Sequence, residues 1–357
     1  MWQMLKTELW KMRNTNIEIL RFVLMVAIFV WHTLVLGLGF MDGQQGMFEY
    51  DGNMLVMFSL CALLAPATYC FVFISGYYGI KFSFSKLLNL LLWVVITAVS
   101  CGVYRYWQGQ VTWYEIYASF LPLVHNRWWF ITAFVSLFIV APFVNTAVEQ
   151  MSKQQISGTL LMLYGILAYR WILLASNAGS SFLGLLFVYI LARFVAINKL
   201  SLSRGKAIIL FVGSLVITTC LASVLYYGLR GRLDPVYAQR IVFQVYAYCN
   251  PLIVVMAVSL FFFVISYTPR TIPWLNILLK TNLFIYLFTQ GVGLFSYKDL
   301  AEMLHESPLK YLGVAGVIII GALLVGHVIA FVAYWLVRSV ELLFDKWGLV
   351  EKISKKL

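Results

Sequence analysis

The chain is built from long, uninterrupted apolar runs, and this feature restricts its fold more than any other. Runs of about 17–27 residues can cross a hydrocarbon core of about 30 Å as α-helices, whereas membrane β-barrels need alternating segments of about 10 residues. The sequence therefore predicts an all-α polytopic membrane protein with about ten transmembrane helices. The predicted spans are 17–40, 54–79, 87–107, 128–148, 157–175, 182–198, 207–228, 242–267, 281–296 and 311–337.

The composition supports this fold class. Hydrophobic residues make up 62% of the chain and charged residues 11%, whereas soluble domains carry about 25% charged residues. A water-soluble enzyme, a nucleic-acid-binding domain and a disordered protein are therefore excluded. We predict a single membrane-embedded domain over residues 1–357, with short cytoplasmic tails at 1–16 and 338–357, and no cleaved signal peptide.

The distribution of Lys and Arg predicts the orientation. Segments on the side of the two termini hold more than twice as many cations as the opposite segments, and the first opposite segment, 41–53, holds none. Because cytoplasmic segments concentrate Lys and Arg, both termini are predicted to be cytoplasmic. The longest outer segment, 108–127, contains an aromatic, amphipathic stretch at 113–124 that could lie in the membrane interface or cover a site.

The residues that usually bind metals show no such pattern. The four histidines lack metal-ligand spacing, and the cysteines lie in apolar stretches without a CxxC motif. We predict no metal site, and free, buried thiols at Cys61, Cys70, Cys101, Cys220 and Cys249.

The first apolar run carries ionisable residues, which are costly inside a membrane and are functional candidates for that reason. Glu18 and Arg21 are three residues apart, so they share a helical face and can pair. His32 follows Arg21 by eleven residues, which is about 20° beyond three full turns and about 16 Å along a helix. This stripe places His32 near the predicted bilayer midplane. The alternative for His32 is a neutral imidazole hydrogen-bonded to a neighbouring helix.

The stretch 13–32, RNTNIEILRFVLMVAIFVWH, resembles the first helix of the acyltransferase-3 family of bacterial membrane O-acyltransferases. That family's signature is an acidic residue, two residues, Arg or Lys, ten residues and His. Glu18, Arg21 and His32 match it position by position.

Three later stretches extend the resemblance over residues 13–337. The first is 70–81, CFVFISGYYGIK, which contains an Ile-Ser-Gly-aromatic motif, and the second is the aromatic stretch 126–145. The third is 282–290, NLFIYLFTQ, where Gln290 stands in place of the family's usual His. A loop Arg-x-x-Arg is often present in the family, whereas Lys81 and Lys86 stand nearby here.

The resemblance implies an enzyme of the bacterial cytoplasmic (inner) membrane. It would transfer an acyl group, usually acetyl, from cytoplasmic acyl-CoA to a hydroxyl of a polysaccharide or lipid-linked glycan on the outer side. The partners would be acetyl-CoA as donor, the glycan and membrane lipids, without nucleic acid or metal, and a homo-oligomer is one state that the sequence allows. The acceptor sugar and the acyl chain length are not specified by the sequence.

Donor binding is assigned to Arg21, Ser75, Gly76, Lys81 and Lys86. The cations would contact the phosphates of CoA, and the two small residues would let its pantetheine arm approach the backbone. The alternatives are ordinary cytoplasmic cations and close helix packing by small residues. Further cationic candidates on this side are Lys199, Arg204, Lys206 and Lys280.

Acceptor binding is assigned to His125, Arg127, Trp128 and Trp129, which cluster at the outer start of the fourth run. Indole rings offer an apolar face and an N–H donor, which suit a sugar ring and equally suit the membrane interface.

Two polar residues inside other spans complete the set. Arg170 could hold an acidic sugar or a lipid phosphate, or form an ion pair with an acidic residue. His327, in apolar surroundings, is predicted to be a hydrogen-bonded structural histidine.

In the implied reaction His32 is assigned as the catalytic base, because a sugar hydroxyl is a poor nucleophile at neutral pH. Direct transfer in a ternary complex and a two-step route, in which His32 or another carrier is acylated first, both remain open. Arg21 would bind the donor or fix the helix, and Glu18 would orient Arg21; a purely structural ion pair is the alternative.

Two proteins of other classes fit part of the pattern. A transporter or flippase for a lipid-linked saccharide would also have many helices with scattered intramembrane Arg, but we expect no internal repeat and no paired broken helices here. A polysaccharide polymerase would carry a larger outer loop than residues 108–127.

Overall fold

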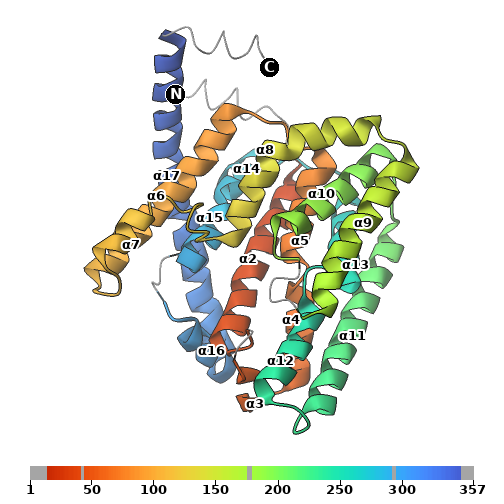
Figure 1. Ribbon diagram of the computed structural model, residues 1–357. Helices are drawn as coiled ribbons and strands as arrows, with labels where there is room; N and C mark the ends of the chain where they lie inside the picture. The colour runs from red at the N-terminus through yellow and green to blue at the C-terminus, as the bar shows by residue number, and fades with distance from the viewer. Residues whose placement is uncertain (1–13, 42–43, 175–178, 292–294, 347–357) are drawn as a thin grey trace.

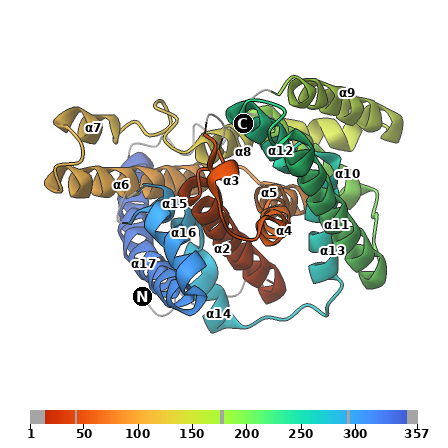
Figure 2. The same cartoon turned by 90° about the horizontal axis from the view of Figure 1, so that it is seen from below.

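The fold is a bundle of α-helices, seen from two directions in Figures 1 and 2. The computed structural model describes residues 14–41, 44–174, 179–291 and 295–346, and this part of the chain contains no strand. Its helices are α2 (Thr15–Gly37), α3 (Gly46–Glu49), α4 (Met54–Leu64), α5 (Ala67–Tyr78), α6 (Phe84–Trp107), α7 (Trp113–Ala118), α8 (Trp129–Gln150), α9 (Lys153–Ile172), α10 (Phe182–Ile197), α11 (Arg204–Leu229), α12 (Pro235–Phe243), η1 (Gln244–Tyr246), α13 (Pro251–Ile265), α14 (Pro273–Leu278), η2 (Leu279–Thr281), α15 (Leu283–Gly291), α16 (Tyr297–Glu306) and α17 (Pro308–Lys346).

Within the described residues, seven helical stretches are long and apolar enough to cross a membrane. These are α2, α6, α8, α11, α17, the combined α4–α5 and the combined α12–α13. The prediction of a polytopic all-α membrane protein is confirmed. The remaining predicted spans coincide with α9, α10 and α15, which are helical but shorter or less apolar, so the count of ten stays a prediction.

Helix α2 lies in the middle of the bundle, and this position makes it the frame of any site built on its side chains. It packs against α4, α5 and α13 on one side and against α15 and α16 on the other, as Figure 2 shows from below. The residues that it buries are mostly apolar, such as Leu24, Met25 and Phe29, which make up part of the main core. Thr15 and Thr33 are also buried, and Glu18, with 4% of its surface exposed, is the one ionisable residue among them.

The described parts of the segments that were predicted to be cytoplasmic lie at one end of the bundle. The start of α2 is fastened to the segment after α13, because Thr15 N donates to the Arg270 carbonyl at 2.7 Å and Ile272 N donates to Thr15 Oγ1 at 2.7 Å. Close to this end, Ser85 at the start of α6 hydrogen-bonds Glu341 near the end of α17. Helix α2 begins, and α17 ends, on the same side of the molecule, toward the top of Figure 1.

The predicted span 242–267 is not one continuous helix. The chain forms α12 and η1, leaves helical geometry at Ala247, and starts α13 only at Pro251. Pro251 has no N–H to continue a preceding helix, and the Asn250 side chain caps the new one by accepting from Leu252 N at 3.0 Å. An interrupted span was not expected from the sequence.

Candidate functional site

His32 lies in the C-terminal half of α2, beside helices from the last part of the chain. Its ring centroid is 6.4 Å from that of Tyr286 in α15 and 6.3 Å from that of Tyr297 in α16. The backbone of Ile28, one turn earlier, interacts with the ring. Nδ1 is nonetheless buried without a hydrogen bond of good geometry among the described residues. The imidazole is therefore held by aromatic neighbours and keeps hydrogen-bonding capacity for a ligand.

His32 is five residues before Gly37, the last residue of α2, which corresponds to about 7.5 Å along the axis. The helix is 23 residues long, so the imidazole is nearer to the C-terminal end of α2 than to its centre. A substrate approaching from that end of the bundle thus has the shorter distance to travel.

Tyr297 is fixed beside His32 by two hydrogen bonds. Gln290 Nε2 donates to its hydroxyl at 2.7 Å, and the hydroxyl donates to the Thr289 carbonyl at 2.7 Å. Gly37 allows α16 to come this close, because a Cβ at residue 37 would stand 2.3 Å from the Tyr297 carbonyl oxygen. A tyrosine near His32 was missed in the sequence analysis, because residue 297 lies outside the motif stretches.

Arg21 and Glu18 form the ion pair that their spacing predicted. Arg21 Nη1 donates to Glu18 Oε1 at 2.8 Å, and 26% of the Arg21 side chain and 5% of the Glu18 side chain are exposed. The Arg21 charge also acts on Tyr78, at the end of α5. The pair lies about 16 Å from His32 along α2, so the two groups serve opposite ends of one helix.

The end of α5 meets α10 closely. Ser75 Oγ donates to the Phe71 carbonyl within the helix at 3.2 Å. A Cβ at Gly76 would stand 2.8 Å from Ala192 Cβ and from the Tyr189 carbonyl oxygen, so Gly76 is needed for helix packing. Its role toward a donor stays a prediction.

The predicted donor cations lie just after this helix end. Lys81 and Lys86 are both exposed. The turn before them is ordered by Tyr189, whose hydroxyl accepts from Ile80 N at 2.9 Å and donates to Asn145 Oδ1 at 2.9 Å. The two lysines are thus free to contact an anionic ligand at the end of the bundle where Arg21 lies.

The four predicted acceptor residues differ in how much of each side chain is exposed. His125 is exposed, and Trp128 is buried, with its indole nitrogen unpartnered among the described residues. Arg127 Nη1 donates to Ser119 Oγ at 2.7 Å, and its guanidinium lies 5.3 Å from the Trp128 ring centroid. Burial lowers the pKa of Arg127 from its ordinary value, but a guanidinium stays charged in proteins.

A continuous series of aromatic contacts joins this cluster to His32. Trp129 contacts Phe130 with centroids 5.9 Å apart, Phe130 contacts Tyr286 at 5.8 Å, and Tyr286 contacts His32 at 6.4 Å. The acceptor cluster and the candidate base therefore belong to one connected wall of rings.

Two other predicted residues lie outside this region. His327 Nδ1 is 2.9 Å from Thr281 Oγ1 and 2.8 Å from the Leu323 carbonyl, and Nε2 is 3.1 Å from the Ile277 carbonyl. His327 is thus a hydrogen-bonded histidine that joins α17 to η2 and α14. Arg170 is exposed in the last turn of α9.

The cysteines are free, and most of them are buried. Cys61, Cys70, Cys101 and Cys249 are buried as predicted, whereas Cys220, on α11, is exposed. Among the described residues, no group of three or more His, Cys, Asp or Glu side chains is placed to hold a metal ion.

The structure is a polytopic helical bundle, and its central helix carries an ion pair and an imidazole. Ionisable residues inside membrane spans usually mark a functional site. Residues 14–331 match the acyltransferase domain of the acyltransferase-3 family, and the chain belongs to that family. The chain is therefore a membrane acyltransferase. No curated protein and no solved structure gives a significant match to the chain.

Proposed function

We propose that the protein transfers an acetyl group from cytoplasmic acetyl-CoA to a hydroxyl of a surface polysaccharide or lipid-linked glycan on the outer side of the bacterial cytoplasmic membrane. The observation that carries this proposal is the position of His32. The imidazole lies beside Tyr286 and Tyr297, about 16 Å from the Arg21–Glu18 pair on the same helix. Donor and acceptor can thus reach one helix from opposite ends.

His32 acts as the general base in this proposal. It removes the proton from the sugar hydroxyl as the hydroxyl oxygen attacks the thioester carbonyl carbon. The carbon–sulfur bond then breaks, and the proton passes from the imidazole to the departing CoA thiolate. In the two-step version, an imidazole nitrogen attacks the thioester carbonyl carbon, the carbon–sulfur bond breaks, and the CoA thiolate leaves with the imidazole N–H proton. The sugar hydroxyl oxygen then attacks the acetyl carbon, the carbon–nitrogen bond breaks, and the hydroxyl proton returns to the imidazole. The His32 Nδ1 atom is buried and has no hydrogen bond of good geometry to the described residues. This supports the proposal that a bound substrate completes the hydrogen bonding of the imidazole.

The donor side of the proposal uses Arg21, Lys81 and Lys86. Arg21 is partly buried, and its guanidinium pairs with Glu18 at 2.8 Å. The lysines are exposed at the neighbouring end of α5. Cationic side chains in this arrangement suit the phosphates of CoA.

The experiment that tests this function compares surface polysaccharides from a wild-type strain and a deletion strain. We expect acetyl esters to be lost while the amount and length of the polysaccharide stay unchanged, and labelled acetyl-CoA to acetylate the deletion-strain polysaccharide only in membranes that contain the protein. Unchanged ester content, together with no transfer of label, would refute the proposal.

A flippase for a lipid-linked saccharide is the second candidate, and one observation favours it. The span Pro235–Ile265 is interrupted between η1 and α13, and interrupted helices are a feature of transporter binding sites. Transport would make the deletion strain accumulate lipid-linked precursor and lose surface polysaccharide, so the same strains distinguish the two functions.

A further inference from the structure

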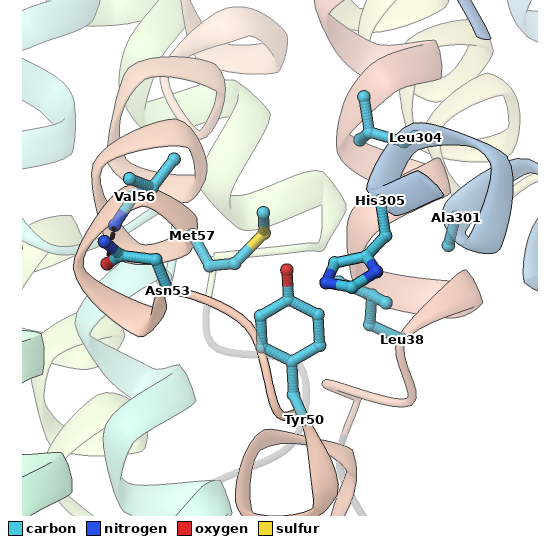
Figure 3. Close-up of a pocket in the computed structure, with 8 residues that line it drawn as sticks. All are labelled: Leu38, Tyr50, Asn53, Val56, Met57, Ala301, Leu304 and His305. Atoms are coloured by element: carbon cyan, nitrogen blue, oxygen red, sulfur yellow. Dashed lines mark hydrogen bonds between the residues drawn. The ribbon is translucent and has the colours of Figure 1, made fainter. Parts of the chain in front are cut away.

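A cavity of about 240 Å³ opens at the end of the bundle opposite to the Arg21–Glu18 pair. The end of α2, the turn after α3, the first turns of α4 and the last turns of α16 line it, as Figure 3 shows. Pockets for drug-sized ligands measure about 300–1,000 Å³. This cavity is smaller, so it suits a ligand of about the size of one sugar ring.

The lining combines an apolar wall with groups that can hydrogen-bond. Met57 and Leu304 supply apolar surface, and the Tyr50 hydroxyl and the His305 imidazole point into the same space in Figure 3. Asn53 uses its Oδ1 to accept from Val56 N at 3.2 Å, which leaves its amide N–H groups for another partner. An apolar face beside several donors is the complement of a sugar ring, which carries C–H groups on its faces and hydroxyls at its edge.

The position of Tyr50 is set by the backbone around it. A Cβ at Gly52 would stand 2.3 Å from the Tyr50 hydroxyl, so the ring folds over a residue that has no side chain. Tyr50 also contacts Phe40 and His305, with centroids 6.1 and 5.8 Å apart. Partial burial and the nearby carboxylate of Asp51 raise the pKa of Tyr50, which keeps its hydroxyl a hydrogen-bond donor.

The charge of the opening indicates which kind of sugar fits. Asp51, Glu302 and Glu306 are exposed on the segments that form the cavity, and His305 Nε2 is 4.0 Å from Asp51 Oδ1. Lys298 contacts one of these carboxylates, Glu302, at 3.9 Å. Carboxylates around the opening disfavour an anionic sugar.

The cavity is connected to the candidate base by two packed helices. Leu38 follows His32 by six residues, or about 9 Å along α2, and His305 follows Tyr297 by eight residues, or about 12 Å along α16. Because α2 and α16 touch at Gly37, the cavity lies outward of His32 within the length of a short oligosaccharide.

We infer that this cavity is a subsite for one uncharged sugar residue of the acceptor glycan, near the residue that His32 would acetylate. The inference rests on the proposed function and extends it. In this role Tyr50, Asn53 and His305 bind the glycan, and none of them contacts the acetyl group. The subsite therefore governs acceptor affinity and leaves donor binding unchanged.

Filling the cavity tests this inference. Val56 lines it and is 48% exposed, so Val56→Trp can place an indole there without disturbing the core. Leu55, one residue earlier and 55% exposed, does not line the cavity, so Leu55→Trp is the matched control. The assay measures transfer from labelled acetyl-CoA to polysaccharide purified from the deletion strain, and thermal protection by acetyl-CoA reports donor binding.

We expect Val56→Trp to raise the KM for polysaccharide by tenfold or more, with thermal protection by acetyl-CoA unchanged and Leu55→Trp like wild type. Tyr50→Phe, which removes one hydrogen-bonding group, should raise this KM by about 2- to 13-fold, the equivalent of about 0.5–1.5 kcal/mol. The ratio of KM values for Tyr50→Phe and wild type should not change with salt; a ratio that falls with salt would indicate an ionic ligand. An unchanged KM in Val56→Trp, in a wild-type background that transfers acetyl groups, would overturn the subsite alone. An absence of transfer by the wild type would instead refute the proposed function.

Discussion

Gln290 donates a hydrogen bond of 2.7 Å to the hydroxyl of Tyr297, and this bond joins α15 to α16 beside His32. Family members usually carry a histidine where Gln290 stands. A glutamine amide and an imidazole can both donate a hydrogen bond. The position therefore holds the ring of Tyr297 in place, and it does not need an ionisable side chain to do so.

Replacing Gln290 tests that role. Gln290→Leu removes the donor, and loss of one hydrogen bond of about 0.5–1.5 kcal/mol should lower turnover by about 2- to 13-fold. The KM for acetyl-CoA should stay the same. Gln290→His should recover most of the turnover, because it restores a donor. A strong loss in Gln290→His would show that the amide has another role.

His32→Ala should abolish acetyl transfer, because losing a general base costs about 10²- to 10⁴-fold in rate. Expression and thermal protection by acetyl-CoA should remain near wild type. His32→Gln keeps a hydrogen-bonding side chain of similar length but cannot take up a proton, and it should be equally inactive. Full activity in His32→Gln would make His32 a structural residue.

Gly37→Ala should disturb the contact between α2 and α16. The added Cβ would meet the backbone of Tyr297 at 2.3 Å, and such overpacking costs about 1–3 kcal/mol. We expect a lower thermal unfolding temperature and lower turnover. Gly158→Ala in α9 is the matched control, because nothing among the described atoms lies within 4 Å of its added Cβ; it should unfold no earlier than wild type. Equal effects of the two variants would contradict the close contact.

Neutral replacement of both Lys81 and Lys86 should raise the KM for acetyl-CoA more than it lowers turnover. Exposed cations attract the CoA phosphates through a screened interaction, so the difference from wild type should shrink at high salt. Lys298→Gln, on the opposite end of the bundle, is the control and should leave the donor KM unchanged. A double variant with a wild-type donor KM would exclude this loop from the site.

Reporter fusions test the orientation. A fusion after Asp51 should report the outer side, and a fusion after Leu357 should report the cytoplasm, because Lys and Arg concentrate on the side of the termini. A fusion after Lys153, the first residue of α9, should agree with the one after Leu357. Opposite signals from the fusions after Lys153 and Leu357 would overturn the predicted topology.

The parts of the fold that hydropathy controls could be predicted from the sequence. Apolar runs marked α2, α6, α8, α11 and α17 because each must bury its backbone hydrogen bonds within itself in lipid. The pair Glu18–Arg21 was predicted for a similar reason, since residues three apart on a helix are neighbours.

The short helices α12 and α16, at the end of the bundle opposite to Arg21, were not predicted, because they are too short or too polar for a hydropathy signal. Local cap signals could have found them. Asp234 caps α12, with Pro235 in its first turn, and Ser296 caps α16 by accepting from Asp299 N at 3.3 Å. The contact between Tyr297 and His32 could not be predicted from a local signal, because it forms between two helices that are far apart in the sequence.

The two sides of the site are far apart in the sequence, so they leave the ribosome at different times. Thr33 and Tyr311, whose hydroxyls are 3.4 Å apart beside His32, are separated by 278 residues. At about 5–20 residues per second, α2 waits on the order of 14–56 s for these partners to emerge from the ribosome. Glu18 and Arg21 need no such partner, because they pair within one turn. In the nascent α2 helix, the Glu18–Arg21 ion pair can thus offset the two charges while the helix is still in the insertion machinery.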